Sequence, residues 1–424
     1  MRFLYSLILY FLSPFMIFRL YWRSLRAPAY RMRIAERFGH TTIKPDRPVI
    51  WVHAVSVGET LAAVPLIRSL INKYPGHHML VTTTTPTGSQ QVHGVFSDKV
   101  FHVYAPYDLP IAVNRFLDTF KPEAGIIMET EIWPNLFHAC KKRKIPLLLA
   151  NARLSEKSAK GYQRLPSLTQ ITLKCIHTVA AQTRADADRF RNLGMADDRI
   201  VITGSIKFDL RLPASLRESA EVLRRELGVN RKVWVAASTH EGEEELLLDS
   251  FEQLLQDMGN LLLIIVPRHP ERFDRAAALC NKRQLVTIRR SSGLACDEST
   301  QVYLGDTMGE LLLLYAAADV VFIGGSLIEH GGHNLLEPAA LGVPSVVGPS
   351  MYNFEEITSR LLECNGIIQV NDAAQLTSST EMLLRDANLC SRMGENAATF
   401  VENNRGALAS LLCLIDGIMT GNRN

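Results

Sequence analysis

The sequence is poor in cysteine, and the cysteines it has are not arranged in pairs. Seven are scattered over 424 residues, and no CxxC spacing occurs. An odd number of widely spaced cysteines indicates neither a disulfide framework nor a zinc site. The pattern fits a protein whose thiols stay reduced in the cytoplasm.

A strong charge of one sign is also missing. The formal net charge is +3, too small an excess to indicate a nucleic-acid partner. No Walker A motif and no GxGxxG fingerprint occur, and residues 53–58 lack the first glycine of a nucleophile elbow. These absences disfavour ATP hydrolysis, dehydrogenation and esterase chemistry.

One long apolar run is present, at the N-terminus. Residues 3–18 are almost wholly apolar, and six arginines follow: Arg19, Arg23, Arg26, Arg31, Arg33 and Arg37. Sixteen helical residues span roughly 24 Å, short of the roughly 30 Å hydrocarbon core. With Leu20 to Trp22 added the run nears spanning length, so a marginal span and an in-plane anchor both stay open.

The arginines indicate the orientation of this segment. They lie on its C-terminal side, which places the body of the protein in the cytoplasm. A signal peptide cleaved near Ala27-Pro28-Ala29 is the alternative. Three arginines between the apolar core and that point argue against cleavage, so we expect a retained anchor.

Strand-like and helix-like patterns alternate along the rest of the chain, which predicts an α/β fold with parallel sheets. A pause around residues 207–219 divides the pattern into two series of seven strands. The predicted strands are Val49–Val52, Met79–Thr83, Val100–Val103, Ala124–Met128, Pro146–Ala150, Thr178–Ala181 and Ile200–Ile202, then Val233–Ala237, Leu261–Val266, Leu285–Ile288, Val302–Leu304, Val320–Ile323, Ser345–Val347 and Ile367–Gln369.

Two doubly wound, Rossmann-like domains facing across a cleft are therefore expected, since a chain of this length exceeds one typical core. We predict an anchor and basic linker over 1–38, a first domain over 39–210 and a second over 211–424. The last helices are expected to pack back on the first domain.

The first candidate site lies in VIWVHAVSVGET, residues 49–60. A buried strand ends in polar residues, Gly58 is expected to let the backbone turn sharply, and Glu59 stands at the start of a helix. The carboxyl ends of parallel strands face the crevice where open α/β sheets bind ligands. Glu59 is thus a candidate catalytic group, and a carboxylate that stabilises the helix dipole is the alternative.

Two further strand exits in the first domain carry ionisable residues. Glu129 and Glu131 follow the strand that ends at Met128, and Lys207 follows Gly204. The carboxylates are expected in the crevice or in a capping role. Lys207 is expected to hold a phosphate or a sugar carboxylate, unless it is a solvated linker charge.

The second domain has candidate anion-binding loops. Ser238 or Thr239 is a predicted N-cap, and free N–H groups at that helix start would suit a phosphate. Arg268, in VPRHPERF, can bind an anion bidentately. Gly309 is expected to open a helix near a ligand, and Gly324-Gly325-Ser326 to offer backbone donors.

The densest motif is EHGGHNLLEPAALGVP. Asn334 and Glu337 lie three residues apart, which places them on one face of a predicted helix. A carboxylate there can accept hydrogen bonds from a ribose diol. His330 and His333 suggest a metal pair, but the sequence offers no third ligand, so no metal is expected.

These motifs resemble the 3-deoxy-D-manno-octulosonic acid (Kdo) transferases of lipopolysaccharide synthesis. The matching pieces are WVHAVSVGET, METEIWPN, NARLSEKS, TGSIKFD, ASTHEGEEE, VPRHPERF and GGHNLLEPAALGVP. They follow the family's order and cover nearly the whole chain.

The resemblance implies a GT-B fold and an inverting transferase that moves Kdo from CMP-Kdo to lipid IVA at the cytoplasmic face of the inner membrane, against its anionic surface. The implied catalytic base is Glu59. The implied transition-state supports are Glu129 or Glu131, with Glu129 preferred, and Lys207. The implied donor contacts are Arg268, His269, Met308, Gly309, Glu310, Gly324, Gly325, Ser326, Asn334, Leu335, Leu336 and Glu337. No cofactor and no nucleic acid are implied.

Two alternatives stay open at this point. One is another GT-B transferase that uses a UDP-sugar and a lipid acceptor. The other is a sugar-nucleotide 2-epimerase, against which the N-terminal apolar segment argues because such an enzyme needs no anchor.

Overall fold

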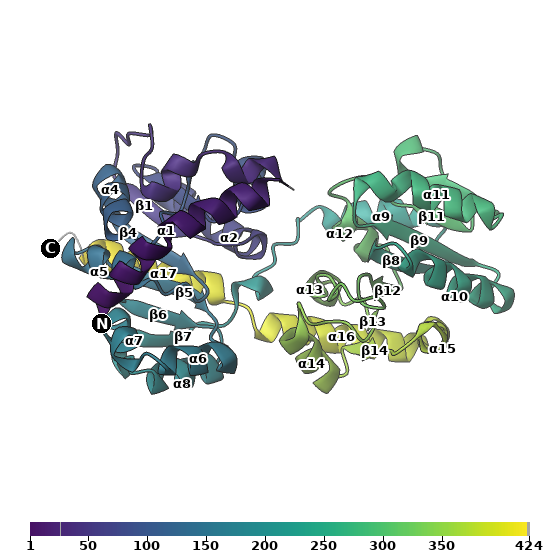
Figure 1. Ribbon diagram of the computed structural model, residues 1–424. Helices are drawn as coiled ribbons and strands as arrows, with labels where there is room; N and C mark the ends of the chain where they lie inside the picture. Colours follow the sequence, from purple (N-terminus) through teal and green to yellow (C-terminus); the bar gives the residue numbers. More distant parts are fainter. Residues whose placement is uncertain (26, 422–424) are drawn as a thin grey trace. The chain divides into compact units, whose positions relative to one another are not determined.

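The computed structural model describes residues 1–25 and 27–421, and it divides into two compact units (Figure 1). Unit 1 comprises Met1–Asp209 and Arg405–Asn424, and unit 2 comprises Leu210–Asn404. Arg26, one of the six predicted flanking arginines, lies outside the described residues. Each unit is an α/β layer structure around its own parallel sheet.

Unit 1 contains a sheet of seven parallel strands in the order β3-β2-β1-β4-β5-β6-β7. The predicted positions of all seven are confirmed: β1 Val49–His53, β2 His78–Thr83, β3 Phe101–Tyr104, β4 Pro122–Met128, β5 Leu147–Ala152, β6 Thr178–Ala181 and β7 Ile200–Ile202. The β1 side chains are all buried, because helices cover both faces of a doubly wound sheet.

Successive side chains of β1 enter two different cores. Val49 and Trp51 pack with α4 (Pro110–Phe120) and α5 (Pro134–Lys142). Ile50 and Val52 pack with α2 (Val57–Lys73), α3 (Pro86–Phe96) and α17 (Ala407–Gly421). The other helices of this unit are α6 Glu156–Gln163, α7 Pro166–Leu173 and α8 Arg184–Asn192.

The last helix, α17, belongs to unit 1 (Figure 1, yellow). Asp209, where the chain leaves the unit, accepts hydrogen bonds from the N–H groups of Gly406 (2.8 Å) and Leu408 (2.6 Å) at the start of α17. Leu411 and Ile415 are buried with the residues of α2. The chain therefore returns to unit 1 at the point where it left.

Unit 2 contains a second parallel sheet of seven strands in the order β10-β11-β9-β8-β12-β13-β14. Their predicted positions are also confirmed: β8 Lys232–Thr239, β9 Leu261–Pro267, β10 Thr287–Arg289, β11 Val302–Leu304, β12 Val320–Ile323, β13 Ser345–Val347 and β14 Ile367–Gln369. The helices are α9 Leu216–Leu227, α10 Glu243–Asp257, α11 Phe273–Lys282, α12 Leu311–Ala316, α13 Leu336–Ala340, α14 Glu355–Glu363, α15 Ala373–Arg385 and α16 Ala387–Asn403.

Three helices of unit 2 begin later than the sequence pattern predicts. Helix α10 begins after Gly242 (φ 83°), and α12 begins two residues after Gly309 (φ 85°). A left-handed residue cannot continue a right-handed helix, so Gly309 precedes α12 and does not open it. Helix α13 begins at Leu336, whose N–H donates to the Asn334 side chain (3.1 Å).

Helix α1, Arg2–Ser24, extends over 23 residues and is the one described helix long and apolar enough to cross a membrane, by length and composition. Its first turns lie against unit 1. Tyr5 Oη donates to Asp108 (3.0 Å), and Ser6 Oγ donates to Asn135 (3.0 Å). The polar side of α1 is therefore part of the packing of unit 1, while Phe3, Phe11 and Phe15 stay exposed.

Candidate active site

Glu59 lies in the first turn of α2, just beyond the end of β1. Ser56 is the N-cap of this helix, and its hydroxyl accepts from the Glu59 N–H (3.2 Å). The Glu59 carboxylate accepts from the Ser56 hydroxyl (2.9 Å) and from the Val55 N–H (2.8 Å). This reciprocal pattern is close to a capping box, so Glu59 has the helix-start role that the sequence left open.

The surroundings of Glu59 also change its acidity. Burial raises the pKa of its carboxyl group to about 7, and the negative charges of Glu129 and Glu131 act in the same direction against the lowering effect of the Val55 and Ser56 hydrogen bonds. A carboxylate with a pKa near the working pH can accept a proton in one step and release it in the next. A purely structural cap does not require this shift.

The two other carboxylates lie where β4 ends. Glu129 has a left-handed backbone (φ 54°), uncommon for a non-glycine residue. The Glu131 carboxylate accepts from the Trp133 indole N–H (2.7 Å), and burial, followed by the charge of Glu129, raises its pKa. The structure thus brings all three predicted glutamates to one edge of the sheet.

Lys207 is carried to the same edge by Asn151. The Asn151 side-chain oxygen, at the end of β5, accepts from the N–H of Ile206 (3.0 Å), in the short helix η4, Ile206–Phe208, that also packs against α2. Asn151 is fully buried with φ 52°, and its Nδ2 has no partner among the described residues. Sequence reasoning missed Asn151, although an amide inside the apolar run LLLANA was the available signal.

The expected role of Gly58 is wrong. Gly58 is the second residue of α2 and is not among the left-handed residues of the described chain. A Cβ placed there would meet only Ser56 Oγ, at 3.9 Å. The change of direction is made by the extended Ser56 (ψ 171°), so no turn at this point requires glycine.

In unit 2, histidines from three strand exits gather around His240, which follows β8. His240 Nε2 lies 2.7 Å from His333 Nε2. Its ring centroid lies 4.4 Å from that of His330 and 5.8 Å from that of His269. Burial and the neighbouring positive groups lower the pKa of His240 to about 4. Among the described residues no group of three or more possible ligands is arranged to hold a metal ion.

Two predicted donor contacts, Arg268 and His269, occupy the exit of β9. Both side chains are exposed. The Arg268 N–H donates to the carbonyl of Thr239 (3.0 Å), which ties this loop to the end of β8. The structure therefore brings them beside His240, which sequence reasoning did not select.

The backbone donors expected after β12 are already occupied. The carboxylate of Glu243, at the start of α10, accepts from the N–H groups of Gly325 (2.7 Å), Leu327 (3.1 Å) and Ser326 (3.2 Å). Glycine is required at position 324 for close packing, because a Cβ there would lie 2.4 Å from the Ser238 carbonyl oxygen. The idea that this turn offers free donors is wrong.

The predicted N-cap at Ser238 or Thr239 is also wrong. Both residues lie within β8, and Ser238 forms an irregularity there with φ 57°. The Thr239 hydroxyl donates to Glu244 (3.0 Å), which also pairs with Arg272 (2.5 Å). The space at the start of α10, next to these two residues, is therefore occupied by carboxylates of the protein itself.

The remaining predicted donor contacts lie on two loops of the same sheet edge. Asn334 precedes α13, so the two residues do not share a helix face, but Asn334 Nδ2 donates to Glu337 (3.0 Å), and burial raises the pKa of Glu337. Leu335 and Leu336 are buried beneath them. On the loop after β11, Met308 is exposed, while Glu310 pairs with Arg290 (2.9 Å).

Two family models match the chain. Residues 32–210 match the model described as 3-deoxy-D-manno-octulosonic-acid transferase, and residues 224–400 match glycosyl transferases group 1. The chain is 43% identical over 417 residues to the 3-deoxy-D-manno-octulosonic acid transferase of Haemophilus influenzae, covering 98% of both chains.

Solved structures also resemble the chain. A glycosyltransferase from Rickettsia africae covers 88% of this chain and 99% of its own, with 15% identity and a TM-score of 0.55, and shows the same fold. The C-terminal CMP-Kdo binding domain of WaaA from Acinetobacter baumannii covers 44% of this chain and 98% of its own, with 40% identity and a TM-score of 0.43.

Proposed function

Because this chain belongs to the Kdo transferase family, we propose that it moves Kdo from CMP-Kdo to lipid IVA, with inversion at the anomeric carbon. Family membership sets aside both the UDP-sugar transferase and the 2-epimerase. The observation that carries the proposal is Glu59, a carboxylate at the end of a central strand whose pKa is raised to about 7.

Glu59 acts as the general base of the proposed reaction. It takes the proton of the attacking acceptor hydroxyl while the oxygen forms a bond to the Kdo anomeric carbon. The bond from that carbon to the CMP phosphate oxygen breaks, and CMP leaves as an anion. General base catalysis typically contributes about 10²–10⁴-fold.

Glu129 and Lys207 support the transition state in this proposal. Glu129 carries negative charge close to Glu59, where positive charge develops on the sugar ring. Lys207 is held at the same edge through Asn151 and Ile206. Glu131 is the weaker candidate because its carboxylate is already bound by Trp133.

Unit 2 is the proposed donor unit. Arg268 and His269 meet the phosphate of CMP, the Asn334–Glu337 pair meets the ribose, and residues 308–310 complete the donor site. One phosphate is balanced by the positive side chains, so we expect no metal or other cofactor.

The membrane location is proposed from α1. The hydrogen bonds of Tyr5 and Ser6 hold its first turns against unit 1, and a transmembrane position for these turns would break them. We therefore propose that α1 is a single anchor lying in the plane of the inner membrane, on the cytoplasmic face, with its exposed phenylalanines in the lipid.

Labelling in intact cells tests this orientation. A single cysteine placed at Arg2, in a variant without the native cysteines, is expected to resist a membrane-impermeant maleimide and to react after lysis. The same result is expected at Lys44, which serves as the cytoplasmic control. Labelling of position 2 in unbroken cells would contradict the in-plane arrangement.

Mass spectrometry of the product tests the proposed reaction. The purified chain with CMP-Kdo and lipid IVA is expected to yield lipid IVA carrying added Kdo, together with free CMP. UDP-N-acetylglucosamine in place of CMP-Kdo is the control and should give no product. An unchanged lipid IVA mass with an active reference transferase in parallel would reject the proposal.

A further inference from the structure

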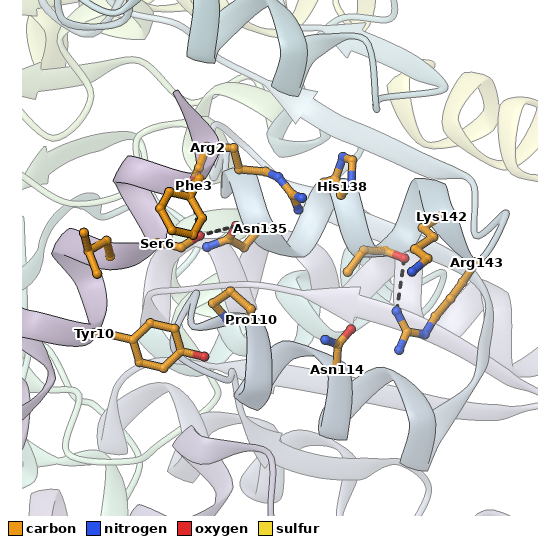
Figure 2. Close-up of a pocket in the computed structure, with 12 residues that line it drawn as sticks. Arg2, Phe3, Ser6, Tyr10, Pro110, Asn114, Asn135, His138, Lys142 and Arg143 are labelled. Carbon is orange, nitrogen blue, oxygen red and sulfur yellow. Dashed lines mark hydrogen bonds between the residues drawn. The ribbon is translucent and has the colours of Figure 1, made fainter.

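A cavity of about 410 Å³ lies between α1, α4 and α5 of unit 1, and we call it the α1 groove (Figure 2). Phe3, Leu7 and Tyr10 of α1 line one side of it. Pro110 and Asn114 of α4, with His138 and Lys142 of α5, line the rest. The groove thus has an aromatic wall next to a polar one, as a site for an amphiphilic molecule would.

The polar wall carries positive charge, which for Arg2 is partly balanced by the Asp108 carboxylate. Arg143 is paired with Asp118 (2.7 Å), but Arg2 and Lys142 have no ion pair among the described residues. Figure 2 shows the Arg2 side chain, from α1, directed toward His138. The groove therefore offers cations from two separate helices to one ligand.

The positive charge of the polar wall also changes the acidity of His138. Burial, followed by the charges of Arg2, Lys141 and Lys142, lowers its pKa. The polar lining nearer Asp108 is not available, because Asn135 is bound to Ser6 (3.0 Å) and to the Asp108 carbonyl (2.7 Å). An anion held by Arg2 and Lys142 would relieve the repulsion that remains.

We propose that the α1 groove binds the phosphate headgroup of a bilayer lipid. The inference rests on the proposed membrane location of α1. A phosphate between Arg2 and Lys142 matches the charge, and the attached glycerol and acyl chains match the aromatic wall. Phe3 is 81% exposed beside the groove, and Phe11, further along α1, is 87% exposed, so acyl chains can leave the groove along an apolar helix.

Vesicle binding by the full chain tests the proposal. Arg2→Gln/Lys142→Gln is expected to weaken binding to phosphatidylcholine vesicles that contain about a third phosphatidylglycerol by roughly 25-fold, because each basic residue near an anionic surface contributes about 1 kcal/mol, or about fivefold. Binding to pure phosphatidylcholine should stay within about twofold, since α1 keeps its apolar side.

A matched pair controls for general electrostatics. Lys44→Gln/Lys99→Gln removes the same charge from exposed lysines that precede β1 and β3 and do not line the α1 groove, and should change binding less than about threefold. Lys142→Gln alone leaves α1 intact and should lose about fivefold. Equal losses in the groove and control pairs would overturn the proposal.

Two further measurements show whether the bound phosphate belongs to a bilayer lipid, to lipid IVA or to a free anion. Inorganic phosphate should compete with the vesicles no better than sulfate of equal ionic strength. The extra binding caused by lipid IVA in phosphatidylcholine vesicles should persist in the groove variant. Loss of that binding alone, or specific competition by phosphate, would assign the groove to the acceptor or to a free anion. No arm contains CMP-Kdo, so failure of the transfer reaction would not be mistaken for failure here.

Discussion

Glu59→Gln is expected to lower the rate of Kdo transfer by about 10²–10⁴-fold. The amide has nearly the same shape as the carboxylate, and its oxygen can still accept from the Val55 N–H, so α2 keeps most of its cap. It cannot take a proton from the acceptor hydroxyl. The measurement is kcat/KM with CMP-Kdo and lipid IVA, together with the thermal shift that CMP produces, which should be retained.

The wild-type pH profile supplies an independent check. The ionised form of Glu59 is the proposed base, so kcat/KM should rise with pH and reach half its plateau near the pKa of about 7. The pKa of Glu59 in the folded protein lies above the ordinary glutamate value of 4.5, so between these two values the folded state holds the proton more tightly than the unfolded state does. Wild-type stability should therefore fall as pH rises from 5 to 7, relative to Glu59→Gln.

The control for this prediction is another helix-start glutamate. Glu156 follows the N-cap Ser155 at the beginning of α6, but it is exposed. Glu156→Gln should change transfer by less than about threefold, because surface substitutions away from a site have small effects. Near-normal turnover of Glu59→Gln, or a wild-type kcat/KM that does not change around pH 7, would show that Glu59 acts only as a helix cap.

Glu243→Ala is expected to destabilise unit 2 by about 3–9 kcal/mol. The substitution leaves the N–H groups of Gly325, Ser326 and Leu327 without acceptors in a buried place, and each buried orphan costs roughly 1–3 kcal/mol. Urea unfolding followed by tryptophan fluorescence measures the loss, since Trp234 is fully buried in this unit.

The matched control lies two residues further along the same helix. Glu245 is exposed in the first turn of α10, and Glu245→Ala should cost less than about 0.5 kcal/mol. The protection of unit 2 by CMP should weaken with Glu243→Ala and stay unchanged with Glu245→Ala. A loss below about 1 kcal/mol for Glu243→Ala would show that water replaces the carboxylate in the turn.

The strands could be predicted because each is a short apolar run bounded by polar residues, and all fourteen were found. Helix starts were less accurate wherever a left-handed glycine such as Gly242 or Gly309 precedes the helix. A glycine is visible in the sequence, but the sign of its φ depends on the loop around it.

The candidate site was harder to predict from the sequence than the strands were. The rule that ligands bind at the carboxyl ends of parallel strands correctly predicted that Glu59, Glu129 and Lys207 lie at one edge of the sheet. It could not show that the donors after β12 are occupied by Glu243, which lies 82 residues away in the chain from Gly325. The His240–His333 contact joins residues 93 apart. Pairings at such separations leave no local pattern.

The closure of unit 1 by α17 affects the order in which the protein is made. During synthesis the ribosome releases residues 1–209 first, yet one face of their sheet is covered only by α2 and α3 until α17, residues 407–421, emerges. Unit 2 is contiguous and can fold in the meantime, since domains generally fold as units. Unit 1 is therefore completed last, after the proposed donor unit, so a chain terminated before residue 407 would lack part of the cover over this face of its sheet.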